Sequence, residues 1–98
     1  MLIVAWPTPS TAFSGYPSLL ICSEKPVGPV NWTFKRLPES EIQHIITDGS
    51  VVSGSTERYG IRSSSLIIYK VQSDDVGSYN CCDANGDVFT YTLTVIGQ

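Results

Sequence analysis

Thiols are the most reactive side chains in this chain, and their number limits how they can pair. Cysteine occurs three times, as Cys22, Cys81 and Cys82. An odd number allows at most one intramolecular disulfide and leaves one thiol to be explained. The cysteines therefore predict one internal bridge, while their number alone leaves open which two residues form it.

Residue types used in catalysis and metal binding are present but are not arranged for either. His44 is the single histidine, and no second histidine or carboxylate stands at a spacing typical of a triad or a zinc site. Asp83, Asn85 and Asp87 alternate as calcium ligands can, but the remaining ligands of an EF-hand loop are missing. No nucleophile elbow or phosphate-binding glycine loop is recognisable. We expect no enzyme activity, no cofactor and no metal site.

One modification motif is present. Asn31-Trp32-Thr33 has the Asn-x-Thr pattern that accepts an N-linked glycan in the secretory pathway. Such triplets also occur by chance, so the motif makes Asn31 a candidate glycosylation site whose occupancy stays open.

Short runs of alternating apolar and polar residues must position these side chains. Gly, Pro, Ser, Asn and Asp separate the runs, and no helical apolar stripe is long enough for a major helix, so the sequence predicts an all-β fold. The predicted strands are a kinked edge strand from Leu2, Val4 and Trp6 through Pro7 and Pro9 to Phe13, then 18–22, 30–35, one or two short strands within 38–54, two within 59–71, one holding Tyr79 and Cys81, and 88–96. Asp48-Gly49 predicts a turn, and Asn85-Gly86 a type I′ hairpin.

Size and charge restrict the function classes. A chain of 98 residues suits one domain spanning 1–98, and its net charge of −3 offers no attraction to nucleic acid or anionic lipid. The longest wholly apolar stretch, residues 1–6, is far shorter than the roughly 20 residues that cross a bilayer. We therefore expect no nucleic-acid partner and no membrane insertion by this segment.

Four motifs occur in a characteristic order. They are Leu20-x-Cys22, Trp32 ten residues later, Leu66-x-Ile68, and Asp75-x-Gly77-x-Tyr79-x-Cys81. Together they resemble the immunoglobulin superfamily over nearly the whole chain. The resemblance implies a two-sheet antiparallel β-sandwich with Greek-key connections, a Cys22–Cys81 disulfide, Trp32 packed on that bridge, and Tyr79 as a tyrosine corner.

Two further features refine the resemblance. Arg58 and Asp75 resemble the salt bridge that closes one end of variable-type domains, and the interval from Trp32 to Arg58 has room for the extra C′ and C″ strands. The interval between the cysteines is short for that class, and residues are missing between Arg58 and Leu66, as in intermediate-set domains. The last strand lacks the aromatic-Gly-x-Gly bulge of antigen receptors, so pairing through that bulge is not expected.

The outer face of the predicted GFCC′ sheet is the candidate partner-binding surface. If Cys81 faces the core, strand alternation turns Cys82 outward. The predicted members of this face are Asn31, Thr33, Lys35, Asn80 and Cys82, with either Phe89 and Tyr91 or their strand neighbours. Polar groups mixed with exposed aromatics suit a protein contact. The alternatives are a merely solvated face and, for Cys82, a partly covered thiol, a mixed disulfide, or an intermolecular disulfide that links a homophilic dimer.

These expectations favour binding at or outside a cell surface. The predicted function is an extracellular protein-recognition module of a cell-surface receptor or adhesion protein, of possible immune type, that binds a protein ligand or receptor through the GFCC′ sheet or its loops. The alternatives are a secreted immune effector or decoy domain, and an intracellular intermediate-set structural domain whose cysteines stay reduced.

Overall fold

The structure, a computed structural model, describes residues 8–23, 25–36 and 41–97. Its elements are β1 (Thr8–Phe13), β2 (Ser18–Leu20), β3 (Asn31–Arg36), β4 (Gln43–Thr47), β5 (Ser50–Val51), β6 (Tyr59–Arg62), β7 (Ser65–Ile68), the 3-10 turn η1 (Ser73–Asp75), β8 (Gly77–Cys82) and β9 (Val88–Ile96). The predicted strand positions at Leu2, Val4 and Trp6, and the start of the 38–54 segment, lie outside the described residues.

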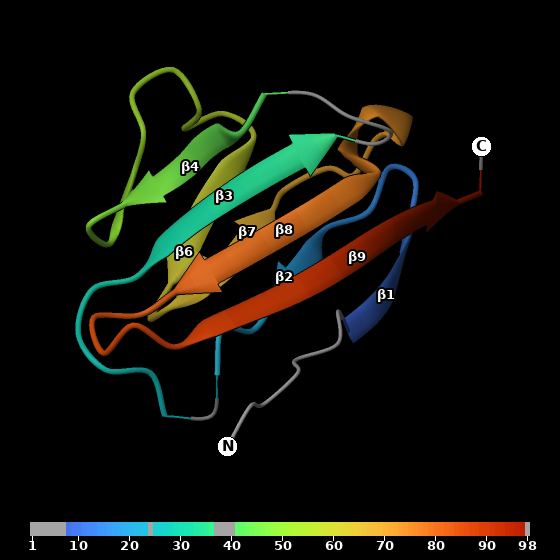
Figure 1. Cartoon of the computed structure of the whole chain (residues 1–98). Coiled ribbons are helices and arrows are strands. Elements are labelled where there is room, and N and C mark those ends of the chain that lie inside the picture. Colours follow the sequence, from blue (N-terminus) through green and yellow to red (C-terminus); the bar gives the residue numbers. More distant parts are fainter. Residues whose placement is uncertain (1–7, 24, 37–40, 98) are drawn as a thin grey trace.

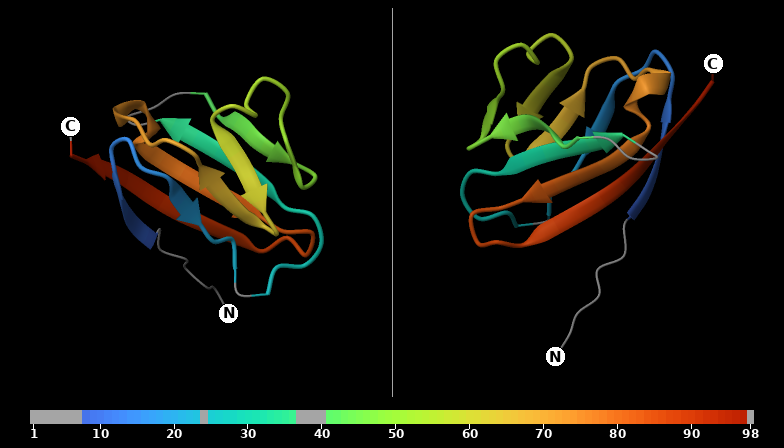
Figure 2. Two further views of the ribbon diagram at one scale, coloured as in Figure 1. Left: turned by 180° about the vertical axis from the view of Figure 1, so that it is seen from behind. Right: turned by 45° about the horizontal axis from the view of Figure 1, so that its top comes forward.

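Within the described residues the strands form two sheets that pack face to face as an immunoglobulin-like β-sandwich. One sheet has six strands in the order β1-β9-β8-β3-β4-β5, and the other has three in the order β2-β7-β6. Figure 1 shows the larger sheet in front. The left view of Figure 2 shows the molecule from behind, with the smaller sheet in front. The predicted all-β sandwich is confirmed, and β4 and β5 extend the larger sheet beyond β3.

One strand pair departs from the predicted antiparallel pattern. β1 runs parallel to β9, from Thr8 opposite Tyr91 to Phe13 opposite Ile96. β1 is an edge strand, which accommodates Pro9, because a proline cannot donate a hydrogen bond to a neighbouring strand.

Alternation places one face of each sheet in a common core. The fully buried large side chains include Trp32, Tyr79, Leu20, Leu66, Ile68 and Leu93. Ile45 and Ile46 are both fully buried although they are neighbours in sequence. The β3–β4 register shifts between Trp32 and Thr33, and such a bulge lets two consecutive residues contribute to the core.

The turn predicted at Asp48-Gly49 and the hairpin predicted at Asn85-Gly86 differ in outcome. Asp48 and Gly49 both have positive φ, 54° and 80°, and form the predicted tight turn between β4 and β5. At Asn85-Gly86 only Gly86 has positive φ, so the type I′ prediction is wrong. The Gly86 N–H donates to the Asp83 carbonyl, and the Asp83 N–H donates to the Asp87 carbonyl, so three residues rather than two separate the closing pair.

Candidate recognition surfaces

The disulfide joins the two layers at the centre of the sandwich. Cys22 and Cys81 are bonded with their Cα atoms 5.5 Å apart, and both are buried. Trp32 lies opposite Cys81 on the neighbouring strand and is fully buried in the same core. Its indole Nε1 donates to the Ser64 carbonyl at 2.9 Å, in the β6–β7 hairpin of the opposite sheet. The bridge and the tryptophan therefore connect the same two layers.

The β6–β7 hairpin, which lies between the two cysteines in the sequence, is tight. Arg62 pairs with Ser65, so only two residues separate the strands, and the first, Ser63, has a φ of 58°. Leu66 follows this turn with its side chain fully buried, in register with Leu20 on β2. The predicted compactness between Arg58 and Leu66 is therefore built into this sheet.

Arg58, Asp75 and Tyr79 form a connected polar group at the opposite end of the sandwich. The Arg58 guanidinium donates to Asp75 Oδ2 at 2.8 Å, and the Tyr79 hydroxyl donates to the Asp75 carbonyl at the same distance. The Gln72 backbone N–H donates to the same Asp75 Oδ2 at 2.7 Å. The predicted salt bridge and tyrosine corner are both present, and they hold η1 against the start of β8.

This environment favours the neutral phenol of Tyr79 and the charged guanidinium of Arg58. Burial is the main cause that raises the pKa of Tyr79 far above its usual value, with Tyr59 and Asp75 adding to it and Arg58 and Arg36 opposing it. The hydrogen bond to Asp75 is the main cause that raises the pKa of Arg58.

The raised pKa of Tyr79 predicts alkaline destabilisation. The folded state holds this proton more tightly than the unfolded state. The stability that Tyr79 contributes is therefore fully present below the unfolded pKa of about 10 and is lost as pH rises above it. Tyr79→Phe is expected to cost about 1 kcal/mol at pH 7, because a hydrogen bond is lost, and to weaken the alkaline decline. Urea unfolding at pH 7 and above pH 10 measures both effects. Equal alkaline slopes for the two proteins would contradict the assignment.

The outer face of the six-stranded sheet consists mainly of neutral polar side chains. The register places Asn31, Thr33, Lys35, Ser78, Asn80 and Cys82 on it, together with Val88, Thr90 and Thr92. Asn31 is exposed, whereas Thr33, Lys35 and Asn80 are half-buried. The Thr90 hydroxyl donates to Asn80 Oδ1 at 2.6 Å and so orders neighbouring strands on the surface. Cys82 is a free, half-buried thiol on this face, as alternation predicts.

Phe89 and Tyr91 do not belong to this face, which corrects their inclusion in the predicted partner-binding surface. They lie opposite Cys81 and Tyr79, on the core side of the sheet. Tyr91 stacks on Trp32 with ring centroids 6.3 Å apart, and its hydroxyl donates to the Ile21 carbonyl. Phe89 remains 37% exposed on that side. The strand neighbours, the alternative left open above, take the outer positions.

The loops beside the N-terminal end of β3 are organised by a buried carboxylate. Asp83 is buried, and its Oδ1 accepts from the backbone N–H groups of Asn85 and Asp87 at 3.0 and 3.1 Å. Its Oδ2 accepts from the Val27 N–H at 3.4 Å, and the Ala84 N–H donates to the Val27 carbonyl. Asp83 therefore joins the loop before β3 to the loop before β9. Of the alternating Asp83, Asn85 and Asp87, Asp83 accepts these bonds with its side chain, while Asn85 and Asp87 donate from their backbone.

The outer face of the three-stranded sheet is apolar and was not among the predicted surfaces. Leu19, Ile21 and Tyr69 are 49%, 51% and 49% exposed, and Ile67 is half-buried in register with Leu19. A shallow hollow of about 230 Å³ on this face is lined by Pro17, Ser18, Leu19, Arg62 and Ile67. Alternation could have found this surface, since Leu19 and Ile21 both alternate with the core residues of their run.

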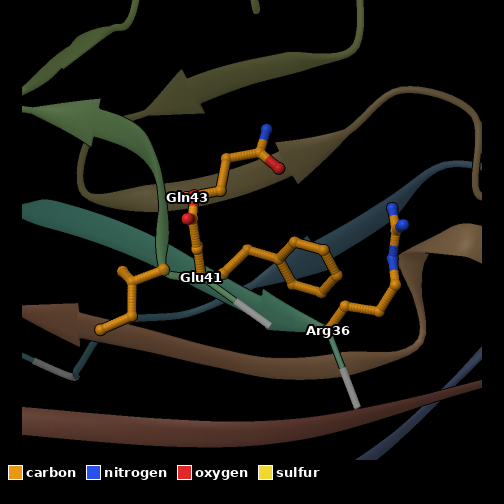
Figure 3. Close-up of a pocket in the computed structure, with 5 residues that line it drawn as sticks. Arg36, Glu41 and Gln43 are labelled. Atoms are coloured by element: carbon orange, nitrogen blue, oxygen red, sulfur yellow. The ribbon is translucent and has the colours of Figure 1, made fainter. Parts of the chain in front are cut away.

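A larger hollow lies at the far end of β3. It has a volume of about 460 Å³ and is lined by Phe34, Arg36, Glu41, Ile42 and Gln43 (Figure 3). Arg36 extends from the end of β3, while Glu41 and Gln43 come from the segment that enters β4. Residues 37–40, which connect these two walls, lie outside the described residues, so we assign no ligand to this hollow.

No family model and no curated protein matches this chain. No helix among residues 8–23, 25–36 and 41–97 is long and apolar enough to cross a membrane.

His44 lies on the outer face of β4, exposed and in register with Thr33. Within the described part of the chain, no three His, Cys, Asp or Glu side chains gather in a group that could hold a metal ion.

Proposed function

We propose that this chain is a variable-like domain of the immunoglobulin superfamily. On this proposal it is an extracellular recognition module of a cell-surface receptor or adhesion protein, and it binds a protein partner through the outer face of β9, β8, β3 and β4 or through the adjoining loops. The observation that carries the proposal is the chemistry of that face.

The outer face is suited to a protein contact because of what a partner would have to desolvate. Thr33, Ser78, Asn80, Thr90 and Thr92 offer neutral hydrogen-bonding groups, which cost less to remove from water than charges do. Lys35 contributes a positive charge at one end. Interfaces of moderate affinity typically combine such polar groups with few charges at their centre.

The extracellular part of the proposal is supported by the Cys22–Cys81 bridge. Disulfides of this structural kind persist in oxidising compartments and are rare in the cytosol. A secreted effector or decoy domain would share this chemistry. An intracellular structural domain would instead keep its thiols reduced.

A capture experiment tests the recognition role. The domain, refolded with its disulfide and tetramerised, is applied to an array of cell-surface ectodomains that includes the domain itself. We expect saturable binding to one ectodomain or a small set, lost when the domain is reduced and unfolded. Self-binding would identify the homophilic form of the proposal. Binding to every ectodomain at the level of the unfolded control, or to none, would overturn it.

A further inference from the structure

Asn31 is held in one orientation at the start of β3. Its side chain is exposed, and its Oδ1 accepts the backbone N–H of Asp48 at 2.9 Å. A backbone N–H can pair only with the oxygen of the amide, so the geometry fixes which way the amide is turned. The Nδ2 atom is therefore on the opposite side from the Asp48 turn. Glycosylation would occur at this nitrogen and would leave the hydrogen bond intact.

The residues beside Asn31 form a row across three strands. Asn31 lies opposite Cys82, and Cys82 lies opposite Val88. Directly opposed residues on one face have Cβ atoms about 5 Å apart. Cys82 is a free, half-buried thiol, and Val88 is 53% exposed. A group attached to Asn31 would lie beside both side chains, at the end of the face where the chain enters β3 and β9 (Figure 1).

We propose that Asn31 carries an N-linked glycan whose first sugars cover Cys82 and Val88. This modification restricts partner binding to the opposite end of the outer face, around Lys35, Ser78 and Thr92, which the register places side by side. The inference deepens the proposed function and rests on it for the secretory location. It also covers the thiol, so that Cys82 stays reduced and forms no disulfide with a second chain.

The chemistry needs one co-reactant, a lipid-diphosphate-linked oligosaccharide supplied by the secretory pathway. Asn31 Nδ2 forms a bond to the anomeric carbon of the first sugar, while the bond from that carbon to the diphosphate oxygen breaks. The diphosphate lipid leaves with the bonding electrons, and the amide proton passes to a base. Thr33 completes the acceptor motif. No electron transfer is involved.

Four forms of the chain test the attachment. Each receives a secretory leader and is made in a eukaryotic cell, and total cellular and secreted protein is scored so that a secretion defect hides nothing. Wild type and Thr33→Ser, which keeps the motif, should show a mass increase that N-glycosidase removes. Asn31→Gln and Thr33→Ala should show none. A wild-type chain without the increase would overturn the proposal, and would leave the capture experiment on refolded, unglycosylated domain unaffected.

Alkylation of Cys82 tests where the glycan lies. A bulky maleimide should label native, glycosylated wild type and Thr33→Ser severalfold more slowly than Thr33→Ala made in the same cells. The control is bacterial protein, in which wild type and Thr33→Ala should label at equal rates. Equal rates in the eukaryotic proteins would show that the glycan points away from Cys82 and would refute the shielding.

Discussion

Replacing Cys22 and Cys81 together by alanine is expected to lower the free energy of unfolding by about 4 kcal/mol. The bridge spans 59 positions, and the loop-entropy relation gives about that value for a closed loop of this length. The loss is a large part of the 5–15 kcal/mol that typical domains possess, so the variant should unfold at much lower urea concentration. Cys82→Ser is the matched control, since this half-buried thiol forms no disulfide within the chain, and it should change stability by less than about 0.5 kcal/mol.

Urea unfolding of the three proteins measures this difference, and a thiol count accompanies it. The denatured, unreduced wild type should contain one reactive thiol per chain. Three thiols would contradict the oxidised extracellular domain, and none would show that Cys82 is bonded to another molecule. An unfolding free energy that is the same for the double alanine variant and the wild type would contradict the role given to the bridge.

Gly77→Ala should be the second most damaging change, at about 3 kcal/mol. A Cβ at Gly77 would lie 2.5 Å from the Lys35 carbonyl oxygen and 3.2 Å from the Arg36 Cα, both backbone atoms of β3. It would also lie 2.6 Å from the Phe34 ring, which stacks on Tyr79 with centroids 4.6 Å apart. Relief requires β3 and β8 to separate at the pair formed by Arg36 and Gly77.

Gly86→Ala separates this clash from the conformational freedom of glycine. Gly86 has a φ of 87°, yet a Cβ there would meet nothing within 4 Å. Its substitution should therefore cost only about 1 kcal/mol, from the backbone conformation. Thermal or urea unfolding of both variants checks the ranking. A Gly86→Ala variant as unstable as Gly77→Ala would contradict the steric explanation.

The elements that the sequence predicted well are those encoded by short strings. Tyr79, Asp75 and Cys81 stand at fixed spacing around one 3-10 turn and one strand, so local geometry determines how they contact one another. The resemblance supplied their distant partners, Arg58 and Cys22. The Trp32 bond to the Ser64 carbonyl could not be foreseen, because it depends on how closely the two sheets approach.

The face of Phe89 and Tyr91 could not be predicted because it depends on one residue of loop length. A two-residue hairpin at Asn85-Gly86 would pair Cys82 with Phe89 and turn both aromatics outward. The structure pairs Cys82 with Val88 instead, because the Asp83 side chain and Gly86 stabilise a three-residue loop. A register shift of one residue exchanges the two faces of a strand. The error in the turn and the error in the surface are thus the same error.

With Phe89 and Tyr91 on the core side, the smaller sheet presents the more apolar face to solvent. The outer face of the larger sheet is polar, while Leu19, Ile21 and Tyr69 make the smaller sheet the more apolar surface. The recognition proposal therefore depends on polar complementarity rather than on exposed aromatic anchors. The apolar outer face of the smaller sheet is the competing candidate for partner binding.

One comparison distinguishes these surfaces directly. Ser78 and Ser65 are both half-buried serines that face outward, one on β8 of the larger sheet and the other on β7 of the smaller sheet. The affinity of the captured partner is measured for wild type, Ser78→Arg and Ser65→Arg, after unfolding curves have shown that both variants are folded. We expect Ser78→Arg to weaken binding about tenfold or more, equivalent to about 1.4 kcal/mol, and Ser65→Arg to leave the affinity unchanged. Weakened binding for Ser65→Arg with full affinity for Ser78→Arg would contradict recognition through the larger sheet.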